Sequence, residues 1–129
     1  MNIFKFFKSI ASLFKEIPMN ENISLDELSQ KLSSLKEGEI ILDVRRPEEF
    51  DEGHIPGARN ISYELVGNYI DELKKYQSIY IHCKMGPRAK MAFQTLKNAG
   101  LNNVICISDA GMKAWIERGY PVGHDKIHN

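Results

Sequence analysis

The sequence predicts a single α/β domain in which a parallel sheet carries helices on both faces. Short apolar runs alternate along the chain with segments whose apolar residues recur at helical spacing, as expected for this class. The apolar runs do not alternate with polar residues, which is typical of strands buried on both sides of a parallel sheet. The length of 129 residues suits one domain, and the hydrophobic content of 43% can build a core without disulfides or a metal.

The N-terminal segment predicts an amphipathic helix. Residues 1–17 place Phe, Ile and Leu on one face and Lys, Ser and Glu on the other. The segment does not fit a transmembrane span or a signal peptide. Two interpretations stay open: the helix packs on protein, either this domain or a second copy, or it lies in a membrane interface with its lysines at anionic headgroups. Pro18 and polar residues then mark a boundary, which predicts a helix over 1–18, a domain over 22–124 and a tail over 125–129.

The first elements of the domain are a capped helix and a strand. Ser24 and Glu27 form a capping-box pattern, and leucines continue at helical spacing to Leu35. Gly38 ends this helix or the turn after it. The apolar, β-branched run 40–44 predicts a buried strand.

The middle of the chain predicts two further strands separated by a helix. Residues 45–57 are polar and predict a loop, and residues 58–61 predict a short strand. Ser62 is a candidate cap for the next helix, whose apolar side continues to Leu73. The apolar run 78–82 predicts a strand that ends immediately before Cys83.

The last third continues the alternation of helix and strand. Residues 88–99 predict a helix with an apolar face, stopped by Gly100. Residues 103–107 predict a strand. A final helix is expected over 109–118 and is closed by Gly119.

Composition excludes several classes of function. The 17 basic and 17 acidic residues cancel, so we expect no nucleic-acid surface. Two cysteines do not make a disulfide framework, and no cluster has zinc-ligand spacing, so we expect neither metal nor cofactor. A reducing compartment is the simpler interpretation, which predicts a cytoplasmic protein, with or without peripheral contact with a membrane through residues 1–17. Cys106 is expected in the core.

Cys83 is the candidate nucleophile. It lies at the carboxyl end of a predicted strand, where open α/β sheets bind ligands. The turn at Gly86, the start of a helix near Arg88, and the charges of Lys84 and Arg88 all favour a thiolate. Such a thiolate can take a sulfur atom from an anionic donor such as thiosulfate and pass it to a second nucleophile. The alternative is a buried, inert cysteine, for which a Gly-containing loop with two cations is less typical.

Three ordered motifs resemble the family of rhodanese-like domains. Residues 82–88, His-Cys-Lys-Met-Gly-Pro-Arg, are similar to its six-residue active-site loop, and the likeness extends through residues 42–60 and 111–115. It covers about residues 22–121 and implies a rhodanese-like fold with a central five-stranded parallel sheet flanked by helices. Related phosphatases and arsenate reductases have a loop one residue longer, so the shorter loop favours sulfur over phosphate chemistry.

The resemblance implies a thiosulfate sulfurtransferase-like enzyme with Cys83 as its catalytic residue. The remaining loop residues are the expected donor-binding set: Lys84, Met85, Gly86, Pro87 and Arg88. The sulfur acceptor is expected to be cyanide or a thiol, such as glutathione or a thioredoxin-like protein. The alternative is a weakly catalytic or non-catalytic module that delivers sulfur to a protein partner, or binds one. Pro87 lacks an N–H, and its presence puts the preferred donor in question rather than the class.

Other polar residues are expected in structural roles. Asp43 is expected to tie the loop after its strand, and Arg45 and Glu49 are expected to pair within the same scaffold. His54 is expected to be structural, because attack by a thiolate needs no base. His82 precedes Cys83 on a strand, so its side chain is expected on the opposite face.

Overall fold

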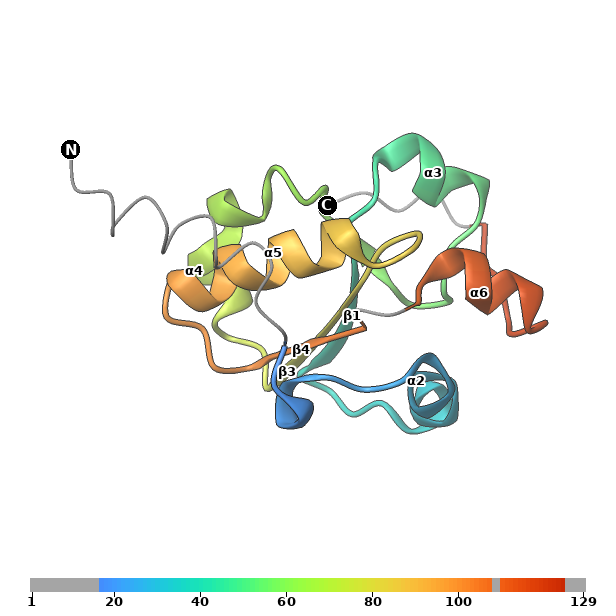
Figure 1. The fold of residues 1–129 in the computed structure, drawn as a ribbon, viewed down its shortest axis with the longest axis horizontal. Helices are drawn as coiled ribbons and strands as arrows, with labels where there is room; N and C mark the ends of the chain where they lie inside the picture. The colour runs from blue at the N-terminus through green and yellow to red at the C-terminus, as the bar shows by residue number, and fades with distance from the viewer. Residues whose placement is uncertain (1–16, 108–109, 125–129) are drawn as a thin grey trace.

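Four parallel strands form the central sheet, in the order β2-β1-β3-β4. The computed structural model describes residues 17–107 and 110–124, and Figure 1 shows the arrangement. The strands in these ranges are β1 (Glu39–Asp43), β2 (Arg59–Asn60), β3 (Ser78–His82) and β4 (Val104–Cys106). All three strand pairs are parallel, which confirms the predicted class of fold.

Helices cover both faces of this sheet. They are η1 (Met19–Glu21), α2 (Leu25–Lys31), η2 (Leu32–Ser34), α3 (Pro47–Glu52), η3 (Val66–Tyr69), α4 (Ile70–Leu73), α5 (Pro87–Asn98) and α6 (Met112–Glu117). Leu42 on β1 packs in a core cluster with Phe93 of α5, whereas its neighbour Ile41 packs in a second cluster with Leu28 of α2 and Trp115 of α6. The alternating sides of each strand therefore build two cores, with α2 and α5 on opposite sides in Figure 1.

The fifth strand implied by the family resemblance is reduced to a single bridge in the described residues. Asn22 forms one parallel bridge with Cys106 at the outer edge of β4, and the Ile23 N–H donates to the Cys106 carbonyl at 3.1 Å. The segment cannot pair further because η1 ends at Glu21 and Ser24 already caps α2. The expectation of five strands is therefore corrected to four.

The predicted capping box is confirmed. The Ser24 Oγ accepts a hydrogen bond from the Glu27 N–H at 3.0 Å, and the Glu27 carboxylate accepts one from the Ser24 N–H at 3.4 Å. The capping box thereby satisfies two of the four backbone N–H groups that have no partner within the helix at the N-terminus of α2. Helical structure continues through η2 to Ser34, close to the predicted end at Leu35.

Three predictions about where helices lie are wrong. The loop over 45–57 contains α3, which Pro47 starts at its first position and whose Glu49 carboxylate accepts from the Arg46 N–H at 3.2 Å. Ser62 does not cap a helix, because the next helix, η3, starts at Val66 with Leu65 at its cap position. The Ser62 carbonyl instead accepts from the Leu65 N–H at 2.8 Å and closes a turn before η3. The last helix begins at Met112, and residues 108–109 lie outside the described ranges.

The predicted stops after the last two helices are confirmed. Gly100 follows α5 with φ of +93°, and Gly119 follows α6 with φ of +73°. Both angles lie in the left-handed region, which glycine adopts without the steric cost that a side chain would bring.

The predicted N-terminal helix falls mainly on residues 1–16, which lie outside the described residues, as does the tail over 125–129. At the described end of that segment, Ile17 is only 7% exposed and packs in the core cluster with Leu42 and Phe93. Ile17 and Pro18 are not in a helix, and the helix over 1–18 stays a prediction. Within the described ranges, no helix is long and apolar enough to cross a membrane.

Candidate active site

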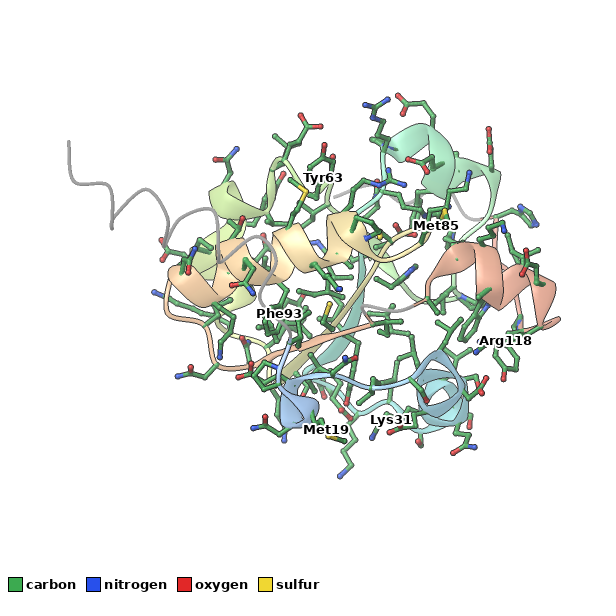
Figure 2. All side chains as sticks on the ribbon, in the orientation of Figure 1. Met19, Lys31, Tyr63, Met85, Phe93 and Arg118 are labelled. Carbon is green, nitrogen blue, oxygen red and sulfur yellow. The ribbon has the colours of Figure 1, made fainter. Side chains whose placement is uncertain are left out.

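Cys83 lies at the start of the loop that joins β3 to α5. Its side chain is buried, with 1% exposure, and its Sγ accepts a hydrogen bond from the Gly86 N–H at 3.0 Å. Figure 2 shows Met85, in the same loop, between α3 and α6. The loop therefore wraps back on its own sulfur, with one backbone donor already directed at it.

The N-terminus of α6 holds one side of this loop. The Met112 N–H donates to the Cys83 carbonyl at 2.8 Å, and the Lys113 N–H donates to the Lys84 carbonyl at 3.2 Å. Gly111 makes this approach possible, because a Cβ built at that residue would lie only 2.1 Å from the Cys83 carbonyl oxygen. The first two carbonyls of the loop are therefore satisfied by backbone donors of α6, which fixes this side of the loop.

Helix α3 holds the other side through an ion pair that the sequence did not predict. The Arg88 guanidinium donates to both carboxylate oxygens of Glu49, at 2.6 and 3.0 Å. This hydrogen bonding lowers the pKa of Glu49 from 4.5 to about 2 and raises the pKa of Arg88. A bidentate pair of this kind fixes orientation as well as charge. Arg88 therefore links α5 to α3, and its charge is already paired.

The Glu49–Arg88 pair should contribute to the free energy of unfolding, and this contribution should decrease at acid pH. Because the pKa of Glu49 is lower in the folded protein than its ordinary value of 4.5, its contribution is complete above pH 4.5 and is lost as pH falls toward about 2. We expect the difference in unfolding free energy between wild type and Glu49→Gln to shrink across this window, as measured by urea titrations. Glu48→Gln, on the same helix, is the matched control, and a wild-type advantage that stays constant down to the acid end would contradict the assignment.

The other loop residues divide into exposed and buried positions. Lys84, Met85 and Pro87 are exposed, with Met85 61% exposed, whereas Gly86 is buried. Gly86 has φ of +123°, a conformation that favours glycine. Pro87 occupies the first position of α5, where a backbone N–H has no partner within the helix, so its missing donor costs the helix no hydrogen bond.

A buried polar cluster supports the strands beneath the loop. The Asp43 carboxylate accepts from the Arg45 N–H at 3.0 Å and from the Arg45 guanidinium at 2.7 Å, which confirms that Asp43 ties the loop after its strand. Arg45 pairs with Asp43, so the expected pairing of Arg45 with Glu49 is wrong. The Asn60 side-chain amide donates to the carbonyls of Asp43 and Arg45, at 3.0 and 2.9 Å. The sequence analysis included Asn60 only as the last residue of the motif over 42–60 and predicted no role for its side chain.

Both candidate histidines have structural contacts. The His54 ring stacks on Phe50 with 3.7 Å between centroids, and its Nδ1 lies 2.8 Å from the Phe50 carbonyl. His82 is fully buried, with Nδ1 3.3 Å from the Cys83 carbonyl and Nε2 3.7 Å from an Asp43 carboxylate oxygen. Burial lowers the pKa of His82, which favours its neutral form. Cys106 is buried in the core, as predicted.

Comparisons with known proteins agree with this geometry. Residues 24–118 match the rhodanese-like domain family. The chain is 41% identical over 93 residues to a putative sulfur carrier protein, YrkF, of Bacillus subtilis, with 72% of this chain and 49% of that protein covered. It is 30% identical over 104 residues to a sulfurtransferase of Allochromatium vinosum, with 81% and 95% covered.

A solved structure of a related protein has the same fold. A rhodanese-related protein of Thermoplasma volcanium superimposes with a TM-score of 0.70 at 28% identity, over 81% of this chain and 99% of that one. The chain spans about half the length of the Bacillus subtilis relative and nearly the whole of the other two proteins. From the match over residues 24–118 and the agreement in fold, the chain belongs to the rhodanese-like domain family.

Proposed function

We propose that this chain is a sulfurtransferase that carries sulfane sulfur as a persulfide on Cys83. The observation that carries the proposal is the Cys83 Sγ, free of any disulfide and hydrogen-bonded to the Gly86 N–H in a loop held by α3 and α6. Relatives named as a sulfurtransferase and as a putative sulfur carrier protein support the same chemistry. The donor is thiosulfate or another persulfide, and the acceptor is a thiol or cyanide.

The reaction divides into two displacements at sulfur. In the first, the Cys83 thiolate attacks the outer sulfur of thiosulfate, a new S–S bond forms, and sulfite leaves with the electron pair of the broken bond. In the second, the acceptor attacks the same outer sulfur, and Cys83 leaves as a thiolate. The Gly86 N–H is placed to stabilise negative charge on sulfur in both steps. Each step is nucleophilic catalysis and needs no external oxidant.

The two cations of the loop have different roles in this proposal. Lys84 is exposed and makes no ion pair with another described residue, so its charge is available to an anionic donor. Arg88 is neutralised by Glu49 and acts as a positioning residue that fixes the start of α5. Exposed Met85 and Pro87 then form the outer edge of the donor site, and Gly86 supplies its amide.

A second candidate function is sulfur delivery to a protein partner with little turnover of small donors. The Bacillus subtilis relative, named as a putative sulfur carrier protein, favours it. The two candidates share the Cys83 persulfide and differ in the acceptor. Comparing the rate of thiosulfate turnover with the rate of transfer to a thioredoxin-like acceptor separates them.

Intact mass spectrometry tests the persulfide directly. After incubation with thiosulfate or a persulfide donor, the full-length protein should gain the mass of one sulfur atom, and peptide mapping should place it on Cys83. Cyanide or a thiol should remove it. Cys106→Ser is the matched control, because Cys106 is equally buried, and it should load normally. Absence of the adduct with every sulfane donor would overturn the proposal.

A further inference from the structure

A cleft of about 580 Å³ lies beside the Cys83 loop, between α3, α6 and the chain after α6. Of the loop residues, Lys84 alone lines it, and its apolar surface comes from Met112, Ile116 and Val122. Small-molecule sites typically occupy roughly 300–1,000 Å³ and combine an apolar lining with a few polar groups. The cleft therefore has the size and lining of a ligand site, and it meets the Cys83 loop at Lys84.

Two residues of the cleft wall hold the backbone of the Cys83 loop by hydrogen bonds. Met112 and Lys113 line it, and their N–H groups donate to the carbonyls of Cys83 and Lys84, at 2.8 and 3.2 Å. One wall of the cleft is therefore the same segment that holds the loop. A ligand at this end of the cleft contacts Lys84, the residue that follows Cys83 in the sequence.

With the lining residue His124 counted as neutral, the formal charges of the lining balance. They are three cations and three carboxylates: Arg45, Lys84, Lys113, Glu49, Glu52 and Glu117. Four of the six are in ion pairs, since Arg45 binds Asp43, Glu49 binds Arg88, and Lys113 lies 3.3 Å from Glu117. Lys84 and Glu52 make no ion pair with another residue in the described ranges. Among the described residues, Lys84 is therefore the lining cation, and Glu52 the lining carboxylate, whose charge no ion pair neutralises.

We infer that this cleft binds the sulfur acceptor, and that the acceptor is a small zwitterionic thiol with its carboxylate at Lys84 and its ammonium group at Glu52. The inference rests on the proposed function of Cys83. A doubly charged anionic donor pairs with Lys84 alone and is repelled by Glu52, whereas a zwitterion pairs with both groups at once. The apolar surface of Met112, Ile116 and Val122 suits the carbon skeleton of an amino-acid-derived thiol of about dipeptide size.

The transfer step balances without another reactant. The acceptor thiol loses its proton to solvent, and its thiolate attacks the outer sulfur of the Cys83 persulfide. The new S–S bond forms as the bond from Sγ to the outer sulfur breaks, and the electron pair returns to Sγ. The products are a persulfide of the acceptor and the Cys83 thiolate, which the Gly86 N–H again stabilises.

Crossed charge deletions test the site. Full-length protein is loaded with thiosulfate and freed of donor, and discharge is followed by mass spectrometry with three thiols. Cysteinylglycine carries both charges, cysteamine only the ammonium group, and N-acetylcysteine only the carboxylate. Discharge by cysteinylglycine should saturate. Glu52→Gln should raise the half-saturating concentration of cysteinylglycine and cysteamine about fivefold, the value of one exposed ion pair, and leave N-acetylcysteine unchanged. Lys84→Gln should instead affect cysteinylglycine and N-acetylcysteine.

Matched controls lie outside the cleft. Glu48→Gln on α3 and Lys90→Gln on α5 remove exposed charges that do not line it, and neither should change the discharge kinetics. Failure of Cys83 to load overturns the proposed function and this inference together. Normal loading followed by discharge that rises linearly with every thiol, or that Glu52→Gln changes equally for all three, overturns the inference alone. So does discharge by a protein thiol that outpaces all three and is insensitive to Glu52→Gln.

Discussion

Cys83→Ser is expected to abolish sulfur transfer while leaving the fold intact. A hydroxyl at this place has no thiolate to attack the donor, so turnover of thiosulfate should fall by at least about 10³-fold, as it does when a covalent nucleophile is removed. The Gly86 N–H should still find an acceptor in the serine oxygen, and the change in volume is small. Steady-state assays of product formation measure the loss.

The same variant also separates a catalytic from a structural role for Cys83. Although Cys83 is 1% exposed and packs in the core cluster, serine has a similar volume and gives the Gly86 N–H an acceptor, so the replacement should cost only about 1 kcal/mol of unfolding free energy. Cys106→Ser removes an equally buried thiol and should retain turnover when assayed at a temperature where it is folded. Comparable residual activity in the two variants would show that Cys83 is not the sulfur carrier.

The sequence predicted those helices and strands whose signals lie within the element itself, such as apolar spacing and capping residues. The helix α5 and the strands β1 and β3 follow from apolar spacing, because their buried faces are long and continuous. The capping box at Ser24 is likewise satisfied within three residues. The helix α3 was missed because Phe50 is its only buried residue, so six residues carry no apolar periodicity.

The partners of the site residues could not be predicted in the same way. The sequence located Cys83 and Arg88 in one loop, but Glu49 pairs with Arg88 across 39 positions of sequence. Arg45 was expected to pair with Glu49 within the same scaffold. The Arg45 side chain instead turns back and donates to the buried Asp43 carboxylate. Its guanidinium also donates to the Gly53 carbonyl, and the Asn60 side-chain amide donates to the Arg45 carbonyl. Such pairings depend on how distant segments pack, which periodicity does not encode.

The role of α6 shows the same limit. Residues 111–115 were one of the three motifs found in the sequence, yet nothing local indicates that Gly111 packs against the backbone of Cys83 and Lys84. Gly111 has φ of −175°, an extended conformation open to any residue, so glycine is not required by its own backbone. Glycine is required there by the close approach of the Cys83 loop.

Gly111→Ala is therefore expected to have the second largest effect. Its Cβ would lie 2.1 Å from the Cys83 carbonyl oxygen and 2.8 Å from the Lys84 carbonyl, and both contacts are with backbone that cannot rotate away. The loop and α6 must separate, which should break the hydrogen bond from the Met112 N–H to the Cys83 carbonyl. We expect a loss of about 1–3 kcal/mol in unfolding free energy and, at temperatures where the protein is folded, about 10²-fold in turnover.

Gly67→Ala is the matched control for this variant. A Cβ at Gly67 would meet only the Thr95 Cγ2 at 3.7 Å, an ordinary contact, so stability and turnover should stay close to those of wild type. Urea titration and initial rates of persulfide transfer measure both quantities in the two variants. If Gly111→Ala lost stability but kept wild-type turnover, the N-terminus of α6 would be a structural support only. A parallel loss of turnover in the folded protein would instead mean that α6 holds the Cys83 carbonyl so that the Gly86 amide stays on the sulfur.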